Sequence, residues 1–316
     1  MTVASVMRAR VARSLAWALA WALACVLASG LAVASESLRI CMADANPPLS
    51  YRSSGEARGL DAALARAIAS DAGRPLEIVF FESEYDRDKT LAQEVNALLS
   101  SGVCGLATGF PLFASDLGAP GRPSARTPDY DGAKPRRQRP FVPLGRLAAT
   151  RAYQAMAMGV VTRDSTLRVQ TLADLQGVQV GAVTGTMAGS ALVLYRNGIL
   201  QKGLVTLSQR EDLLAALEAG RFDATLTPLN RYDAYRLAHP GTRIVRGAFV
   251  HPVRINLGVV GLESEPALMA GADGAVARAL ADGALARWAE EAGASWIRPE
   301  PPDVQPAFTI NSLRVD

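Results

Sequence analysis

The sequence predicts an α/β protein with mostly parallel sheets that is divided into two lobes. Short apolar runs of strand length alternate with segments whose apolar residues keep helical spacing, and this order is typical of βαβ crossovers. About 280 of the 316 residues follow a leader-like first segment, and that number exceeds one ordinary hydrophobic core. Because 49% of the residues are hydrophobic, a disordered chain is excluded.

Residues 1–34 are predicted to be a signal peptide. An apolar run at 14–24 and an A-x-A cleavage pattern at 32–34 follow a basic region that contains Arg8, Arg10 and Arg13. A retained membrane anchor is one alternative. Lipid attachment is another, because Cys25 follows a triplet that loosely resembles a lipoprotein box. In each case the folded part is exported, and we expect it in the periplasm.

Residues 35–316 carry no net charge. They hold 30 basic and 30 acidic side chains, so the formal charge of +3 belongs to the leader. The slightly basic composition therefore does not indicate nucleic acid or an anionic membrane as a partner.

Cys41 and Cys104 are the two cysteines that remain after the leader. Both lie in short apolar runs, and disulfides persist in an oxidising compartment, so we predict a disulfide between them. Two buried free thiols are the alternative. No C-x-x-C motif is present, and His239 and His251 each lie beside a proline in predicted loops. We therefore expect neither a metal site nor a cofactor.

The first half of the folded chain alternates strands with helices. Prolines at 47 and 48 end the first strand, because proline cannot donate to a strand ladder, and glycines at 73 and 102 follow the two helices. The helices are predicted to begin near residues 60 and 91, and the strands are predicted over residues 38–43, 76–81 and 103–110.

Residues 119–146 interrupt this alternation. Six prolines and a basic cluster at 134–139 predict a long irregular loop. The loop is either a solvated surface excursion or a rim or docking element near the ligand.

After the loop the alternation resumes with a strand at 153–161 and a short helical turn at 171–175. Further strands are predicted over 178–183, 222–227 and 254–260, and helices over 187–196, 210–219, 265–281 and 284–292. The proline-rich segment 299–303 is predicted to adopt a polyproline conformation.

Four stretches resemble, in their order and spacing, the bacterial extracellular solute-binding proteins of family 3. These are the periplasmic substrate-binding proteins of ABC transporters with a type II fold. The stretches are 59–69, 97–104, 171–186 and 214–224, and together with 257–260 and the last helices they cover most of 38–293. Ala62 and Ala63 depart from the family pattern, which usually has a larger apolar residue and an acid there.

The resemblance implies a two-lobe periplasmic-binding-protein-like fold in which each lobe is a mostly parallel sheet flanked by helices. Lobe 1 is expected at 35–154 plus 256–316 and lobe 2 at 155–255, with two hinge crossovers close to Tyr153 and Asn256. The resemblance also implies a monomer that takes a small polar solute, typically an amino acid, into an interlobe cleft. An inner-membrane ABC permease would receive the solute.

Ligand-binding residues are expected at the carboxyl ends of the parallel strands, where loops and helix N-termini meet. Residues 184–186 open a helix, and they either offer polar groups to an anionic ligand or cap their own helix. The aromatic candidates either stack on a ligand or pack within a lobe. The candidates are Asp44, Asn46, Tyr51, Tyr85, Gly109, Phe110, Thr184, Gly185, Thr186, Thr227 and Asn230.

The sequence lacks the two charged anchors that the family usually offers to an α-amino acid. Pro111 stands where a threonine is usual, residues 112–118 contain no arginine, and residues 227–230 contain no acid. Without a bidentate arginine and a paired carboxylate, an ordinary α-amino acid is not the expected ligand. The exception would be an arginine, Arg122 or Arg126, that reaches the site from the proline-rich loop.

Two other classes of function stay open. A few proteins of this appearance are cleft enzymes such as dehydratases, in which Glu84 or Asp44 would have to be the general acid. No catalytic motif supports that reading, so we expect a protein that is not an enzyme. Others are accessory proteins of periplasmic quinoprotein dehydrogenase systems. An accessory protein would co-purify with such an enzyme, whereas a receptor would respond to a panel of small solutes.

Overall fold

The computed structural model describes residues 36–83 and 90–314. The predicted signal peptide, the Cys25 alternative and the candidates Tyr85 and Glu84 lie outside the described residues. Within the described ranges, no helix is long and apolar enough to cross a membrane.

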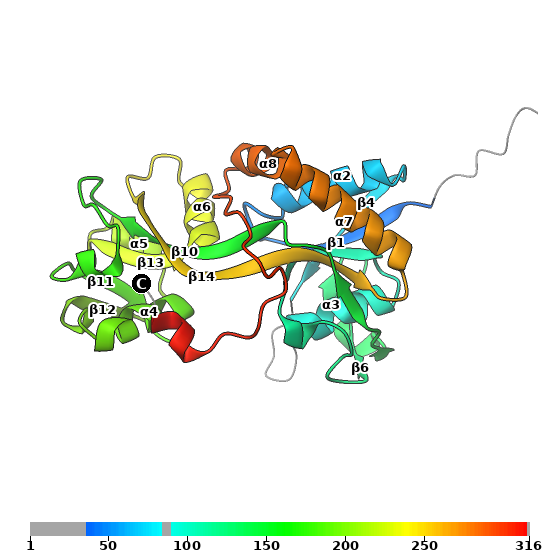
Figure 1. The fold of residues 1–316 in the computed structure, drawn as a ribbon, viewed down its shortest axis with the longest axis horizontal. Helices are drawn as coiled ribbons and strands as arrows, with labels where there is room; N and C mark the ends of the chain where they lie inside the picture. Colours follow the sequence, from blue (N-terminus) through cyan, green and yellow to red (C-terminus); the bar gives the residue numbers. More distant parts are fainter. Residues whose placement is uncertain (1–35, 84–89, 315–316) are drawn as a thin grey trace, which may run out of the picture. The chain divides into compact units, whose positions relative to one another are not determined.

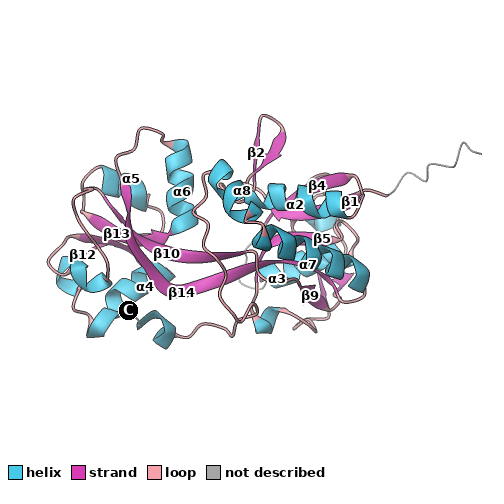
Figure 2. Ribbon diagram, turned by 45° about the horizontal axis from the view of Figure 1, so that its top comes forward, coloured by secondary structure: helices cyan, strands magenta, loops and turns pink. Residues whose placement is uncertain are grey.

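Within these ranges, ten strands form one mixed sheet in the order β12-β11-β13-β10-β14-β5-β1-β4-β7 (Figure 2). The edge strand β7 comprises Asp129–Tyr130, and β9 (Leu147–Ala149) is also paired to β14. At one end lie the parallel strands β1 (Leu38–Ala43), β4 (Leu76–Glu82) and β5 (Leu106–Pro111). At the other end lie the parallel strands β11 (Val180–Val183), β12 (Leu204–Leu207) and β13 (Ala224–Pro228). Between them run the antiparallel strands β10 (Gln154–Thr162) and β14 (Val245–Leu262). The predicted α/β class is confirmed.

The first end of the sheet is covered on both faces, because successive residues of β1 point to opposite sides. Ile40 is buried with the helices α2 (Leu60–Asp71), α7 (Pro266–Ala281) and α8 (Ala284–Ala292). Cys41 is buried with α3 (Leu91–Ser100). Figure 1 shows α2, α7 and α8 grouped together. All four helices agree with the sequence prediction.

Cys41 and Cys104 form the predicted disulfide, with 5.8 Å between their Cα atoms. Cys104 lies before β5, so the predicted strand 103–110 begins too early. The residues just before β5 instead close the end of α3, where Val103 N–H donates to Leu98 O, and then contact β1, where Gly105 N–H donates to Arg39 O. Both cysteines are buried in the α3 side of the core, which gives the bond a structural role.

The second end of the sheet carries α4 (Met187–Leu194), α5 (Leu213–Glu218) and α6 (Leu229–Ala238). Val160 is buried in the cluster that contains α4, and its neighbour Val161 in the cluster that contains α5 and α6. The predicted helices 187–196 and 210–219 are longer than the observed ones. Arg196, at φ +41°, leaves the helical conformation, and Asp212 caps α5 by accepting hydrogen bonds from the N–H groups of the next turn.

Several elements escaped prediction. The hairpin of β2 (Tyr51–Ser53) and β3 (Glu56–Arg58), the short strand β12 and the helix α6 were not predicted. The predicted strand 254–260 is only the second half of β14. Its first half contains Pro252, and the register with β10 shifts between Ala157 and Gly159, so the residues there lack a regular alternation.

The proline-rich segment 119–146 is tied to the sheet in places. Within it, β6 (Ser124–Ala125) pairs with β8 (Val142–Pro143), and β7 (Asp129–Tyr130) adds to the edge strand β4. Phe141 is 62% exposed, and the guanidinium carbon of Arg126 lies 4.4 Å from the centre of its ring. Arg126 thus faces a side chain of its own segment, and neither Arg126 nor Arg122 forms a hydrogen bond or ion pair with a candidate ligand-binding residue among those that the structure describes.

The C-terminal segment packs differently from its expected assignment to lobe 1. Its last turn, η6 (Ile310–Arg314), lies against α4, and Leu313 is buried in the cluster formed by α4 and β11. Figure 1 shows this segment in red, running from α8 to the neighbourhood of α4. The chain therefore passes from one end of the sheet to the other a third time.

Candidate functional site

The carboxyl end of β1 leads into a turn that carries Asp44. One carboxylate oxygen of Asp44 accepts a hydrogen bond from Ala45 N–H at 2.8 Å, and the other pairs with Arg52 Nε at 3.0 Å. Arg52 also pairs with Asp131 at 2.5 Å, and its guanidinium carbon lies 4.4 Å from the centre of the Phe80 ring. The hydrogen bond to Asp131, followed by that to Asp44, raises the pKa of Arg52. Two carboxylates and one guanidinium leave this cluster with a formal charge of −1.

Asn46 and Tyr51 follow in the same turn and stay partly accessible. Asn46 closes the turn through its backbone, since its N–H donates to Ser50 O at 2.8 Å and its carbonyl accepts from Leu49 N–H at 2.9 Å. Tyr51 begins β2 opposite Arg58. Both candidates therefore keep their side chains available at the end of β1.

Gly109 takes part in a buried network that the sequence did not predict. Gly109 N–H donates to Tyr153 Oη at 2.9 Å, and Tyr153 Oη donates to Asp61 Oδ1 at 2.6 Å. Gly109 has φ +71°, and a Cβ there would lie 3.0 Å from Asp61 Oδ2, so glycine suits this close approach. Asp61 is 1% exposed. Burial raises its pKa to about 7, although the Tyr153 hydrogen bond lowers it.

Phe110 is 2% exposed and lies in the core on the α3 side of the sheet. Its ring therefore packs within the protein, which is the packing alternative of the two that the sequence left open. Neighbouring Pro111 ends β5 opposite Leu257 of β14.

Residues 184–186 connect β11 to α4. The Thr186 hydroxyl accepts from Gly189 N–H at 3.0 Å and donates to Val183 O at 2.8 Å, so it caps its own helix. Thr184 is exposed, and its carbonyl accepts from Gln209 Nε2 at 3.2 Å. Of the two threonines, Thr184 is the one whose hydroxyl forms no hydrogen bond within the described part of the chain.

Thr227 and Asn230 lie where β13 passes into α6. Thr227 is fully buried opposite Gly159, and its hydroxyl has no hydrogen-bond partner among the residues that the model describes. Asn230 is partly exposed in the first turn of α6. Of this pair, Asn230 is the side chain that a solute could reach.

The two histidines, His239 and His251, lie in different surroundings. His239 follows α6 and stacks on Tyr235 with 4.1 Å between ring centres, and His251 is fully buried in β14. Among residues 36–83 and 90–314, no group of three or more potential metal-ligating side chains is found.

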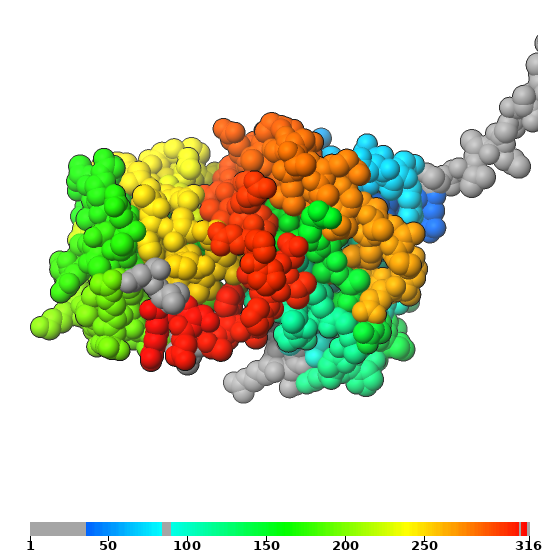
Figure 3. Space-filling view, viewed as in Figure 1, coloured from blue at the N-terminus to red at the C-terminus, as the bar shows by residue number. Residues whose placement is uncertain are grey.

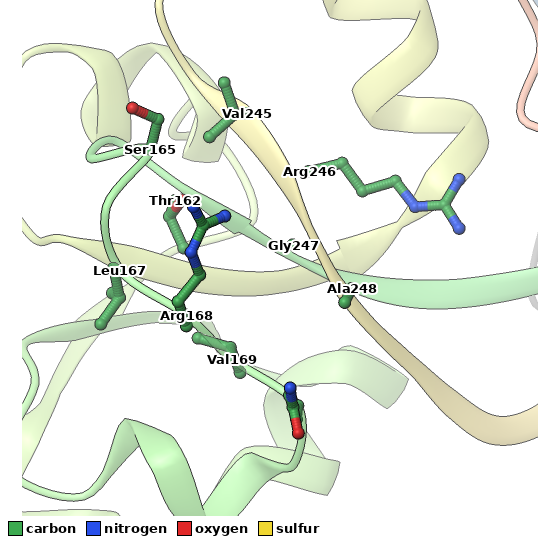
Figure 4. A pocket seen from close by; sticks show the side chains of 10 residues that line it. Thr162, Ser165, Leu167, Arg168, Val169, Val245, Arg246, Gly247 and Ala248 are labelled. Carbon is green, nitrogen blue, oxygen red and sulfur yellow. The ribbon is translucent and has the colours of Figure 1, made fainter.

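Besides a cavity between α2 and α7, two cavities in the described part of the chain contain none of the predicted site residues. One, of about 240 Å³, lies between the loop 165–170 and the start of β14 (Figure 4). In Figure 4, Arg168 reaches from the loop toward Thr162, while Arg246 points away. The other, of about 150 Å³, lies between α3 and the segment 115–121, where burial raises the pKa of Asp116. No sequence motif marked either cavity.

Comparison with known proteins identifies the fold. No protein-family model matches the chain, and no curated protein matches it. Among solved structures, the unliganded, open L-cystine solute receptor of Neisseria gonorrhoeae is similar, at 16% identity and a TM-score of 0.56, over 84% of this chain and 95% of that one. The open substrate-binding domain 2 of GlnP from Lactococcus lactis matches at 16% identity and 0.56, over 81% and 95%. An ancestral cationic amino acid solute-binding protein matches at 16% and 0.53, over 81% and 94%.

These likenesses confirm the predicted two-lobe, type II periplasmic-binding-protein fold. The two ends of the sheet are the two lobes, and β10 and β14 are the two crossing strands between them. At 16% identity the likeness concerns the fold. The role of each candidate residue therefore has to be argued from its own contacts.

Proposed function

We propose that the protein is an exported receptor that captures a small polar solute between its two lobes and delivers it to an ABC-type uptake permease. The observation that carries this proposal is the two-lobe fold, which spans 95% of the chain length of two solved amino acid receptors. In such a fold a solute that contacts both lobes stabilises the closed arrangement, which is a population shift. The same observation favours a receptor over an accessory protein or a dehydratase, and the matched proteins are binding proteins.

The sequence supports a location for this receptor, and the strand pairing supports its lobe boundaries. We place the protein in the periplasm because of the leader-like residues 1–34. We also propose that it acts as a monomer and has no enzymatic activity. We place the lobe boundaries near Gln154 and Asn256, where β10 and β14 lie side by side with Ala155 opposite Asn256.

The charges at the strand ends support a neutral or cationic solute over an ordinary α-amino acid. The cluster of Asp44, Arg52 and Asp131 has a formal charge of −1, and its only cation is already paired with two carboxylates. A ligand carboxylate placed there would meet net repulsion. Among the predicted candidates of lobe 2, the side chains that stay accessible at the ends of β11 and β13 are the neutral ones of Thr184 and Asn230.

A solute panel tests the proposal. The mature protein, with its disulfide intact, is screened by thermal shift against neutral polyols, polyamines and α-amino acids, and calorimetry then gives the dissociation constant of each responding solute. We expect a neutral or cationic solute to bind. Thr184→Ala should raise the dissociation constant of that solute about fivefold, which corresponds to the loss of roughly one neutral hydrogen bond.

Thr206→Ala provides the matched control, because Thr206 is an exposed threonine on β12 and is not one of the predicted site residues. It should bind the solute as the wild type does. A panel without any binder would contradict the receptor proposal. Equal weakening by both substitutions would contradict the role of Thr184.

A further inference from the structure

We propose that residues 295–313 form a strap that holds the two lobes in their observed arrangement and so sets how readily they close on a solute. The consequence for solute binding rests on the proposed function, whereas the mechanical role does not. The strap contacts lobe 2 at both of its ends and lobe 1 and the crossing strands in between.

The first anchor joins the strap to α6 of lobe 2. Asp233 is 2% exposed, and its carboxylate accepts hydrogen bonds from Ser295 N–H at 2.7 Å and from Ser295 Oγ at 2.9 Å. Gly293, just before the strap, approaches α6 so closely that a Cβ there would lie 3.1 Å from Leu237 Cδ2. The start of the strap is thus fixed to lobe 2 although it follows α8 of lobe 1.

The second anchor lies on the crossing strands themselves. Trp296 Nε1 donates to Tyr153 O at 3.1 Å, and Ala155 N–H donates to Ile297 O at 2.9 Å. Asn256, which is fully buried, donates from its side-chain amide to three strap carbonyls. The acceptors, at 2.9, 3.1 and 3.2 Å, are those of Glu300, Pro302 and Asp303.

The third anchor joins the strap to lobe 1 beyond β5. Gln305 N–H donates to Leu112 O at 2.8 Å, and Ala114 N–H donates to Gln305 O at 2.9 Å. The side chain of Gln305 also accepts from Asn256 N–H at 3.0 Å. The rings of Phe308 and Phe113 meet edge to face with 5.4 Å between their centres.

The fourth anchor returns the strap to lobe 2. Leu313 is 8% exposed in the cluster formed by α4 and β11, and Phe308 packs against the same cluster. Figure 3 shows the strap in red on the surface, running from the orange region of α7 and α8 toward the green region that contains α4. Because lobe 2 holds both ends and lobe 1 holds the middle, a relative movement of the lobes has to break at least one anchor. The strap therefore favours one arrangement over others, as a ligand with differential affinity does.

Distances between the lobes test the strap without any solute. Spin labels are placed on two exposed positions, Lys202 in lobe 2 and Glu290 in α8 of lobe 1, through cysteine substitution in the otherwise intact mature protein. We expect one interlobe distance distribution in the wild type. Leu313→Ala and a deletion of 306–316 should broaden it or add a second population, because each removes the fourth anchor.

Two further variants make the result interpretable. Val304→Ala changes a 37% exposed side chain of the strap and should leave the distribution unchanged. Leu313→Met keeps the buried volume and should keep the wild-type distribution. If the deletion does not fold, the comparison of Leu313→Ala with Leu313→Met still tests the fourth anchor. Unchanged distances in Leu313→Ala would overturn the strap, whatever the solute panel shows. Altered distances in Leu313→Ala together with a solute panel that finds no binder would leave the strap standing and count against the receptor alone.

Discussion

The buried carboxyl of Asp61 should make the stability of the protein depend on pH. Burial raises its pKa from 3.8 to about 7, while the hydrogen bond from Tyr153 opposes this shift. The folded state therefore keeps a proton that the unfolded state loses, so the free energy of unfolding falls as the pH rises from about 4 to about 7 and is level above that window. A shift of roughly three pH units at 1.36 kcal/mol per unit corresponds to about 4 kcal/mol.

Asp61→Asn should remove this dependence, because an amide still accepts the Tyr153 hydrogen bond but does not titrate. Urea unfolding between about pH 4 and pH 8 should show the wild type losing about 4 kcal/mol relative to Asp61→Asn. Other titrating groups cancel in this difference. Asp129→Asn, at an exposed aspartate, should give a curve parallel to that of the wild type. If the Asp61→Asn curve also ran parallel, the reasoning about burial would be refuted.

Two further predictions concern stability. Replacing both Cys41 and Cys104 by alanine should lower the free energy of unfolding by about 4 kcal/mol, the value of the chain-entropy model for a loop of 63 residues. Urea unfolding of this variant and of the unreduced wild type measures the difference, and an equal midpoint would contradict the prediction. Tyr153→Phe should lower the free energy of unfolding by about 1–3 kcal/mol, because Gly109 N–H loses its acceptor. In the urea experiment, Tyr153→Phe should also extend the fall in the free energy of unfolding to higher pH, since the Tyr153 hydrogen bond lowers the pKa of Asp61. An unchanged pH range would contradict this effect of Tyr153 on Asp61.

The sequence predicted elements whose signals are local and regular. The helix α7 has a proline in its first turn and Gly283, at φ +71°, separates it from α8, so both helices were predicted within a residue of their observed bounds. The helix α6 escaped because its buried face consists of two tyrosines, a leucine and Asp233. A buried aspartate contradicts the apolar pattern that predicts a helix face, and only its contact with Ser295, 62 residues later, explains it.

The candidate site was predicted at the level of strand ends and not at the level of side-chain roles. Topology correctly brought Asp44 and Asn46 to the end of β1, and Thr184 to the end of β11. The sequence could not show that Arg52 binds Asp44, because that depends on a hairpin that was not predicted. Asp61 stood in a family-like stretch, but its partner Tyr153 lies 92 residues away.

One feature of the sequence, a polar residue within an apolar run, could have indicated the strap. Asn256 interrupts the apolar run 255–260 of β14, and a buried amide needs partners that a regular ladder does not offer its side chain. A proline-rich segment suits this need, because prolines contribute carbonyl acceptors without N–H groups that would compete for pairing. The run of prolines at 299–302 was predicted to be a polyproline tail, and that conformation leaves its carbonyls free to accept. A polar residue within an apolar strand and a distant proline-rich segment can therefore be considered together as a hypothesis for a contact, and here the structure joins them at three carbonyls.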